Sequence, residues 1–212
     1  QIFYYRGGGN GYTNTMFWLR TGIGVMKFVH PDDTNRDEKE EYIRKKAEPA
    51  IRYAEILLIY AEALNELTGN YNIASWDEET QYTIQRNIDE MKKGIQPIRI
   101  RAGIPDYTRS EYEDQDLFRE KLKRERQIEL MGEGHRYYDI RRWKDAEVEE
   151  SLPIYGCNTL MTEKWRDVFH VPVAIPSLPT NFSRKMYFWP ISHSELKRNK
   201  MLTQNPGWTY ND

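Results

Sequence analysis

The clearest pattern of hydrophobic positions lies in residues 49–68, where apolar side chains recur at every turn of a helix. Projected at about 100° per residue, they cover most of the helix circumference, and only Arg52, Glu55 and Glu62 form a narrow polar wedge. A helix that is apolar almost all round is usually buried, so we expect this one to lie in the core. Gly69 follows it and suits the left-handed turn that ends many helices.

Three further helices are expected in the middle of the chain. The first covers residues 79–100, where Gly94 and Pro97 indicate a break or a kink. The second covers residues 110–131 and begins with the Ser-x-x-Glu spacing of a capping box. The third is short and covers residues 135–143.

The periodic pattern is confined to these helices. Residues 1–48 are expected to form a segment rich in loops and β structure, residues 49–145 the helical core, and residues 146–212 a loop-rich C-terminal cap that packs on the helices. Six prolines after residue 145 favour extended, irregular packing there. The expected fold class is therefore mainly α, with paired antiparallel helices, an irregular cap and short β segments.

Composition excludes several classes of protein. The 31 basic and 33 acidic residues give a net charge of −2, which argues against dedicated binding to nucleic acid or to anionic membranes. No apolar run is long enough to span a bilayer. Cys157 is the only cysteine, so neither an internal disulfide nor a cysteine-rich metal site is expected. The chain begins at Gln1 without a signal peptide, which suggests a processed chain or a fragment.

The helix expected at residues 110–131 carries two carboxylates on its apolar side. Its apolar arc consists of Leu117, Phe118, Leu122, Ile128 and Met131. Glu125 and Glu129 fall inside this arc, one turn apart, and buried carboxylates must be paired with cations or protonated. Because arginines are abundant, we expect a structural ion-pair network that locks the helices together. Its expected members are Arg52, Glu55, Glu125, Arg126, Glu129, Arg141 and Arg142.

The same two carboxylates allow an alternative, glycoside hydrolysis, in which acid and base groups stand about 5–10 Å apart. A dense arginine surround would hold both groups ionised and unfit to act as general acids. The glycines at residues 7–9 are not followed by the lysine of a phosphate-binding loop, and the four histidines lack the spacing of a zinc site. We therefore expect no catalytic residue, no metal and no cofactor.

Four segments, taken together, resemble one protein family. Residues 52–66 resemble the RYAEVLLMYAEALNE helix of the SusD/RagB family of nutrient-binding lipoproteins from Bacteroidota. Residues 99–105 are similar to its IRxRAGLP segment, and residues 124–143 to ERRIELAFEGHRYFDLRRW. Residues 189–208 resemble its closing PIPxxEL and LTQNPGY segments, with Ser192 in place of the second proline. The four segments occur in the order that the family has.

The resemblance implies a SusD-like α–α superhelix, of which this chain is the C-terminal part. Members of the family are usually much longer, with a lipid-modified cysteine near the mature N-terminus and additional tetratricopeptide-like helices. The helix pairs here would be the later repeats, and residues 64–74 resemble a tetratricopeptide turn. Because Cys157 is interior, any lipid anchor would lie on the missing N-terminal part.

The resemblance also implies binding rather than catalysis. Proteins of this family lie on the cell-surface side of the outer membrane, where they capture oligosaccharides, or peptides in some members, for a SusC-like TonB-dependent transporter. Sugar rings stack on aromatic side chains, so the contacts are expected in the aromatic N-terminal loop. The candidate ligand-binding residues are Tyr4, Tyr5, Asn10, Tyr12 and Trp18, with Trp76 and Trp165 as secondary candidates. Two alternatives remain: a helical-repeat module that docks the transporter without touching the nutrient, and an enzyme.

Overall fold

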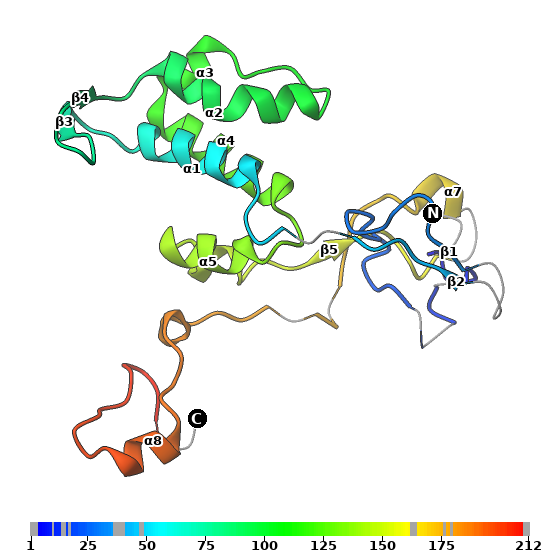
Figure 1. Cartoon of the computed structure of the whole chain (residues 1–212). Coiled ribbons are helices and arrows are strands. Elements are labelled where there is room, and N and C mark those ends of the chain that lie inside the picture. Colours follow the sequence, from blue (N-terminus) through cyan, green and yellow to red (C-terminus); the bar gives the residue numbers. More distant parts are fainter. Residues whose placement is uncertain are drawn as a thin grey trace. The chain divides into compact units, whose positions relative to one another are not determined.

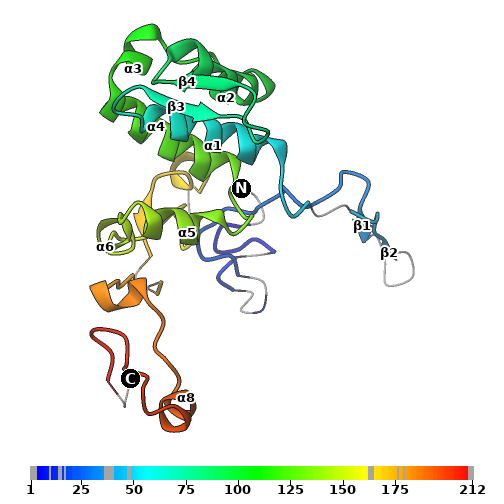
Figure 2. The same cartoon turned by 60° about the vertical axis from the view of Figure 1, so that its left-hand side comes forward.

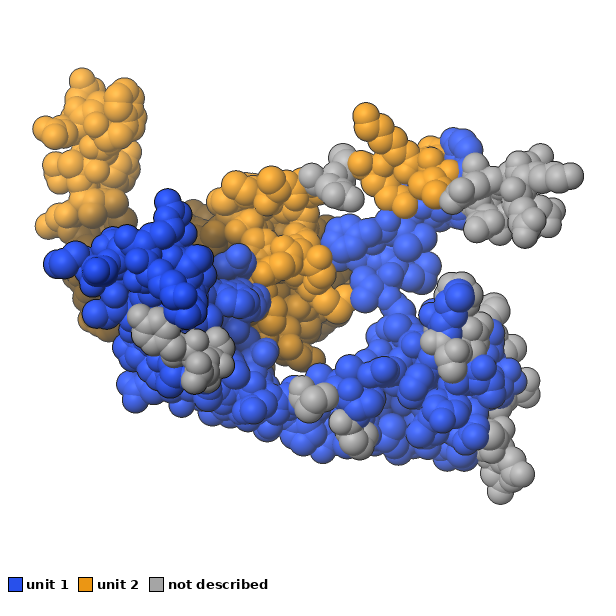
Figure 3. Space-filling model, turned by 90° about the horizontal axis from the view of Figure 1, so that it is seen from below, with its two compact units in different colours: residues 1–42, 137–212 blue, residues 43–136 orange. Residues whose placement is uncertain are grey.

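A computed structural model describes residues 4–9, 11–13, 16, 18–35, 41–46, 49–161, 165–175, 177–178 and 180–209 of the chain. The chain divides into two compact units, each with its own hydrophobic core. Unit 1 comprises Gln1–Tyr42 and Tyr137–Asp212, and unit 2 comprises Ile43–Arg136 (Figure 3, blue and orange). The three-part division expected from the sequence, at residues 48 and 145, stays a prediction.

Unit 2 consists of helices joined by a β-hairpin and short turns (Figures 1 and 2). In chain order its elements are α1 (Tyr53–Asn65), β3 (Tyr71–Ala74), β4 (Gln81–Ile84), α2 (Ile88–Arg101), α3 (Arg109–Glu113) and α4 (Gln115–Glu129). Helix α5 (His135–Arg142) begins in unit 2 and continues into unit 1. Helix α1 packs against both α2 and α4, and the antiparallel β3–β4 hairpin projects beyond α1 and α2.

The core of unit 2 forms where α1, α2 and α4 meet. Its buried side chains are Ala54, Leu58, Ala61, Leu64, Met91, Ile95, Ile98, Tyr112, Phe118, Leu122 and Leu130. Gly94 lets α1 and α2 approach closely, because a Cβ at this position would lie 2.8 Å from the Cβ of Ala61 and would clash with the carbonyl oxygen of Leu57. Helix α2 continues through Gly94 and through Pro97, which lies on its exposed side. The expected break in this helix is therefore absent.

The expectation that α1 is buried on all sides is wrong. Its exposed side consists of Tyr53, Ile56, Ile59, Tyr60 and Ala63, which we call the open face of α1. Among its four large side chains, the exposed fraction ranges from 41% for Tyr60 to 75% for Tyr53. The polar residues Glu55 and Glu62 lie instead among the partly buried positions. Within unit 2, α2 and α4 cover the side of α1 that carries its charges and leave open a side without charged residues, on which the Tyr60 hydroxyl donates to Glu90 of α2 at 2.8 Å.

The helix expected to begin at residue 79 begins at Ile88, because residues 71–84 form a hairpin. Tyr71 pairs with Ile84 and Ile73 with Tyr82, so one face of the hairpin is apolar. The alternation of polar and β-favouring residues in β4 accounts for the strand. Helix α2 then starts at Asn87, whose side chain accepts a hydrogen bond from the backbone N–H of Glu90.

The helix expected at residues 110–131 is two helices, α3 and α4, separated at Asp114. The capping box starts at Thr108 rather than Ser110: Glu111 Oε2 accepts from the Thr108 N–H at 2.7 Å, and the Thr108 hydroxyl accepts from the Glu111 N–H. Asp114 caps α4, accepting from the backbone N–H groups of Asp116 and Leu117. Two capping side chains within six residues explain why the chain breaks here.

The apolar arc expected on this helix is narrower in the structure. Phe118 and Leu122 are buried, as expected, but Leu117, Ile128 and Met131 are 43%, 57% and 52% exposed. Helix α4 packs on α1 and α3, and these neighbours bury only part of its circumference. The expectation that all five side chains face the core is therefore wrong for three of them.

Unit 1 has little regular structure. Its elements are β1 (Thr34–Asn35), β2 (Glu41–Tyr42), the rest of α5, α6 (Ala146–Glu149), β5 (Tyr155–Gly156), α7 (Trp165–Val168), β6 (Val173–Ala174), the 3₁₀ helix η1 (Arg184–Tyr187) and α8 (His193–Arg198). Strands β1–β2 and β5–β6 pair antiparallel. A small core of Ile140, Ala146 and Phe182, with Met186 and Tyr187 packed against it, holds α5 to the C-terminal segment.

The C-terminal segment of unit 1 is closed by side-chain to backbone hydrogen bonds. Gln204 accepts from the N–H of Ile191 at 2.8 Å and donates to its carbonyl oxygen at 2.9 Å. The indole N–H of Trp208 donates to the carbonyl oxygen of Phe188 at 2.9 Å. These bonds join residues 188–191 to 204–208, the two parts of the C-terminal motif found in the sequence.

The expected fold class is confirmed: the chain is mainly helical, with only short strands. Among the helices of the described residues, none has the length and apolar character needed to cross a bilayer. The described residues likewise contain no group of three or more His, Cys, Asp or Glu side chains placed to hold a metal ion.

Candidate ligand-binding site

A cluster of arginine and aromatic side chains lies in the N-terminal loop of unit 1. The ring centroids of Tyr12 and Trp18 are 4.9 Å apart and their planes meet at 85°, an edge-to-face geometry. The guanidinium carbon of Arg6 lies 5.1 Å from the centroid of Tyr12, and that of Arg20 lies 5.6 Å from the centroid of Trp18. Both are within cation–π range. We call Arg6, Tyr12, Trp18 and Arg20 the aromatic cluster.

The two rings differ in accessibility. Tyr12 is 43% exposed, whereas Trp18 is partly buried. The indole N–H of Trp18 is buried and has no hydrogen-bond partner among the described residues. Tyr12 is therefore the more accessible ring of the two, and Trp18 packs against it.

Backbone turns hold the loop on which the cluster stands. The N–H of Gly8 donates to the Tyr5 carbonyl oxygen at 2.9 Å, and the N–H of Gly11 donates to the Gly8 carbonyl oxygen at 3.0 Å. A Cβ at Gly11 would clash with the Tyr5 carbonyl oxygen. The hydroxyl of Thr13 closes the loop by donating to the Arg6 carbonyl at 2.9 Å. The glycine-rich stretch thus serves tight turns, which agrees with the absence of a phosphate-loop motif.

The second side of the cluster is attached to the β5 region. Arg20 donates from Nη1 to the carbonyl oxygen of Ser177 at 3.2 Å. The carbonyl oxygen of Thr21 accepts from the Cys157 N–H at 2.8 Å, and a Cβ at Gly156 would lie 2.8 Å from the Thr21 backbone. The cluster therefore stands on a loop that is bonded to regular structure at one end.

The other expected ligand-binding residues are not part of the aromatic cluster. Tyr4 packs on Gly24, where a Cβ would lie 2.7 Å from the phenolic oxygen, and Tyr5 packs on Gly7. Both tyrosines are partly buried. Asn10 lies outside the described residues. The structure thus brings Tyr12 and Trp18 together. Arg6 and Arg20 were missed from the sequence, although each lies within six residues of an expected aromatic residue.

Of the secondary candidates, Trp76 lies in the turn between β3 and β4 in unit 2 and is 96% exposed. The turn is held by the Ser75 N–H, which donates to the Thr80 carbonyl at 2.7 Å. Trp165 begins α7 in unit 1. Trp76 does not belong to the aromatic cluster, and the side chain of Trp165 lies outside the described part of the structure.

The carboxylate pair of α4 is saturated by donors within unit 2. Glu129 accepts from Arg52 Nη1 on Oε1 at 2.9 Å and from Arg101 on Oε2. Arg52 also forms a two-pronged pair with Glu133, at 2.7 Å for both bonds. These contacts, chiefly the hydrogen bonds to Glu133, raise the pKa of Arg52 above its usual value. Glu129 is thus a structural junction between the start of α1 and the end of α2.

Glu125, one turn earlier, is 5% exposed. Its Oε2 accepts from Arg99 at 2.6 Å and from the hydroxyl of Tyr107 at 2.8 Å. Burial, followed by the hydrogen bond to Glu125, raises the pKa of Tyr107 above its usual range, so this phenol stays a donor at neutral pH. Glycoside hydrolysis requires two carboxylates that are exposed in an open groove, and neither Glu125 nor Glu129 is exposed in this way.

The remaining expected members of the network fall into separate contacts. Arg126 is buried, with its Nε 3.9 Å from Glu62, and Glu55 lies 3.5 Å from a ring nitrogen of His135. Arg141 and Arg142 belong to unit 1. There Arg141 stacks 3.5 Å above the ring of Tyr137 and 5.2 Å from that of Phe182, and Arg142 donates to Asp139 at 2.9 Å.

The partners that sequence reasoning missed are Arg99, Arg101 and Glu133. Arg99 and Arg101 lie in the last turn of α2, where their positive charges also favour the helix dipole. The Arg-x-Arg spacing at a helix end is the signal that could have found them.

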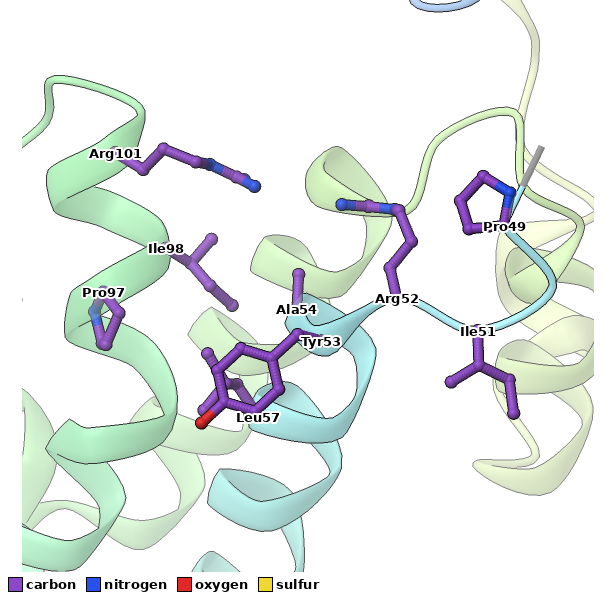
Figure 4. Close-up of a pocket in the computed structure, with 9 residues that line it drawn as sticks. All are labelled: Pro49, Ile51, Arg52, Tyr53, Ala54, Leu57, Pro97, Ile98 and Arg101. Carbon is purple, nitrogen blue, oxygen red and sulfur yellow. The ribbon is translucent and has the colours of Figure 1, made fainter. Parts of the chain in front are cut away.

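A shallow hollow of about 430 Å³ opens between the start of α1 and the end of α2 in unit 2. It is lined by Pro49, Ile51, Arg52, Tyr53, Ala54, Leu57, Pro97, Ile98 and Arg101. Figure 4 shows Arg52 and Arg101 extending toward one another from the two sides, where both meet Glu129. With its arginines paired and its walls largely apolar, the hollow suits an apolar group. It adjoins the open face of α1 through Tyr53.

The sequence model of the SusD family matches residues 1–208. SusD-like protein P2 of Formosa agariphila is 31% identical over 162 residues, which cover 74% of this chain and 25% of that protein. A solved SusD-like protein from Bacteroides fragilis is 28% identical, with a TM-score of 0.55 over 75% of this chain and 25% of its own. The selenomethionine form of BT4246 is 25% identical, with a TM-score of 0.59 over 77% of this chain and 25% of its own.

The chain spans about a quarter of the length of these relatives. The family's sequence model nevertheless extends over both units, and the aligned structures share the helical arrangement. The chain belongs to the SusD family.

Proposed function

We propose that this chain is part of a binding protein that captures a nutrient, an oligosaccharide, at the bacterial cell surface. Membership of the SusD family supports this assignment. The observation that carries it is the Tyr12–Trp18 pair, an accessible phenol ring supported edge-on by a partly buried indole.

The geometry of the pair suits a sugar ring. The C–H groups on one face of a pyranose pack against an aromatic ring, while hydroxyls at the ring edge need hydrogen-bond partners. Arg6 and Arg20 carry donors beside the two rings. The phenolic hydroxyl of Tyr12 can both donate and accept. The cluster therefore offers stacking and hydrogen bonding in one place, and no cofactor is needed.

A binding role, rather than catalysis, also fits the state of the two α4 carboxylates. Glu125 and Glu129 each accept from at least two donors, so neither is available as a general acid. Incubation with oligosaccharides is expected to produce no new reducing ends. The appearance of such ends would refute the binding-only assignment.

The proposed partner is a SusC-like TonB-dependent transporter, to which the bound nutrient is handed for import. The proposed location is the cell-surface side of the outer membrane, reached through a lipid anchor that lies outside this chain. Both assignments rest on the family. Co-purification from outer-membrane extracts, followed by identification of the transporter by mass spectrometry, tests them together.

Isothermal titration against a panel of oligosaccharides and peptides tests the capture role directly. The double variant Tyr12→Ala/Trp18→Ala is expected to lose the binding that the unmodified chain shows. The matched control is Trp76→Ala, which removes an exposed tryptophan outside the cluster and is expected to bind normally. Unchanged affinity in the double variant would remove these two residues from the site, and binding of peptides alone would replace the oligosaccharide.

A second candidate function, docking of a protein partner without direct nutrient contact, is favoured by the open face of α1. Five neighbouring exposed positions on one helix carry isoleucine, tyrosine or alanine and no charge, and the largely apolar hollow adjoins them. A pull-down of the transporter in the absence of any oligosaccharide tests this function. Ile59→Glu on the open face is expected to abolish capture, whereas Lys93→Glu, an exposed position of α2, is expected to leave it intact.

A further inference from the structure

The aromatic cluster contains two arginines. Arg6 lies over Tyr12 and Arg20 over Trp18, so each ring of the pair has a guanidinium beside it. Among the described residues, no ion pair joins either arginine to a carboxylate. Arg20 donates to the backbone carbonyl of Ser177 through Nη1, which leaves its net charge uncompensated. The site therefore presents two positive charges that no carboxylate of the described residues pairs with.

The charge of the surrounding sequence has the same sign. Residues 1–31 contain Arg6, Arg20 and Lys27 but no aspartate and no glutamate, although the whole chain has a net charge of −2. The first acidic residues, Asp32 and Asp33, are occupied in a turn with His30: Asp33 accepts from the His30 N–H at 3.1 Å, and Asp32 lies 3.8 Å from its ring nitrogen. The positive charge is thus a local property of the loop that carries the cluster.

Neutral sugars do not require this arrangement. An aromatic platform with amide or hydroxyl groups satisfies a neutral ring, and a guanidinium adds electrostatic attraction only when the ligand is negative. A guanidinium presents a planar fork of donors that matches the two oxygens of a carboxylate or of a sulfate. Stacking over an aromatic ring restrains the arginine side chain, so the side chain loses less conformational entropy when it binds a ligand.

We propose that the aromatic cluster selects an acidic oligosaccharide, in which one ring stacks on Tyr12 and carboxylate or sulfate groups pair with Arg6 and Arg20. This proposal rests on the proposed capture of an oligosaccharide and names its chemical class. Each ring of the pair has its own arginine, so the proposed ligand carries charges on more than one unit.

Matched pairs of ligands test the charge. An oligogalacturonide is compared with its methyl-esterified form, which keeps the rings and removes the carboxylates. A κ-carrageenan oligosaccharide is compared with its desulfated form. Isothermal titration is expected to give affinities about tenfold higher for the charged member of at least one pair, and the pair that shows the difference identifies carboxylate or sulfate. The difference is expected to shrink as the salt concentration rises, because exposed charges are screened.

Substitutions test which residues read the charge. Arg6→Gln and Arg20→Gln are each expected to lower the affinity for the charged ligand by about three- to tenfold, with little effect on its neutral partner. Arg6→Lys keeps the charge but not the fork and is expected to restore part of the loss. Lys27→Gln removes a positive charge from the same loop outside the cluster and is the matched control, expected to bind like the unmodified chain.

The outcomes separate this proposal from the proposed function. Equal affinity for both members of both pairs would overturn the acidic ligand and leave the capture of oligosaccharides standing. An equal loss in Lys27→Gln and in the arginine variants would also overturn it, because the effect would then be one of general charge. Absence of binding to every oligosaccharide would overturn both. Circular dichroism of each variant, with an unchanged melting curve, excludes loss of folding as the cause.

Discussion

Arg99 donates from Nη1 to Oε2 of Glu125 at 2.6 Å, joining the last turn of α2 to the buried side of α4. The guanidinium also lies 3.9 Å from the ring centroid of Tyr107, whose hydroxyl donates to the same carboxylate oxygen. One guanidinium thus connects two helices and the segment between α2 and α3.

Removing this guanidinium should destabilise unit 2 strongly. Arg99→Ala leaves Glu125 buried without its cation, which is expected to lower the free energy of unfolding by about 3–5 kcal/mol. Urea denaturation followed by circular dichroism measures the loss. The control is Arg109→Ala, which removes an exposed pair with Glu113 and is expected to change the free energy of unfolding little. Similar losses in the two variants would contradict the buried role of Arg99.

Two adjacent residues of α1 should behave in opposite ways. Leu58 is fully buried and Ile59 is 46% exposed. Leu58→Ala is expected to lower the free energy of unfolding by about 2–5 kcal/mol, because it leaves a cavity in the core. Ile59→Ala is expected to change it by less than about 0.5 kcal/mol. If both cost the same in urea titrations, α1 is rotated from the position described here or is covered on its open face.

Gly94 should resist even the smallest substitution. Gly94→Ala adds a Cβ that meets the Leu57 carbonyl oxygen and the Ala61 side chain, so we expect a loss of about 1–3 kcal/mol despite the higher helix propensity of alanine. Thermal unfolding by calorimetry measures it. Gly69→Ala is the matched control, since a Cβ there meets nothing within 4 Å, and it is expected to leave the melting temperature nearly unchanged.

The cap of α3 should weaken in acid. The hydrogen bond from Lys121, followed by that from the Thr108 backbone, lowers the pKa of Glu111 from its model-compound value of 4.5 to about 2. Because the folded-state pKa is depressed, the stabilising contribution of Glu111 is complete above the unfolded-state pKa and is lost as the pH falls through 4.5 toward 2.

Glu111→Gln should therefore flatten this part of the stability profile. Free energies of unfolding measured in urea at neutral pH and at pH values between 4.5 and 2 give the difference between variant and unmodified chain. The difference is expected to shrink as the pH falls. A difference that stays constant across this range would show that the carboxylate of Glu111 does not titrate with folding.

The helical core could be predicted from the sequence because its signals are local. The apolar repeat at residues 49–68 located α1, and the segment at residues 135–143 located α5 to within one residue. The β3–β4 hairpin was missed because its strands are only four residues long and the polar run between them was assigned to the start of a helix. The break at Asp114 was missed because a capping side chain interrupts an otherwise helical pattern.

The candidate site likewise contains some residues that could be predicted from the sequence and others that could not. Aromatic content pointed to Tyr12 and Trp18, and the structure brings them into contact. The arginines beside them could not be predicted, since cation–π pairing depends on how a glycine-rich loop folds back on itself. Buried carboxylates at residues 125 and 129 implied cationic partners, but the choice of Arg99 and Arg101 depends on how α2 meets α4.

The orientation of α1 has one more consequence. Rolling the helix about its axis would hide Ile56 and Ile59, but it would also carry Glu55 away from His135 and Glu62 away from Arg126. Gly94 adds steric resistance, because the side chains that flank Ala61 would be driven into α2. The charged contacts and the close approach at Gly94 thus fix the rotation of α1 about its own axis. They keep Ile56 and Ile59 facing outward, although exposing apolar side chains to water is unfavourable.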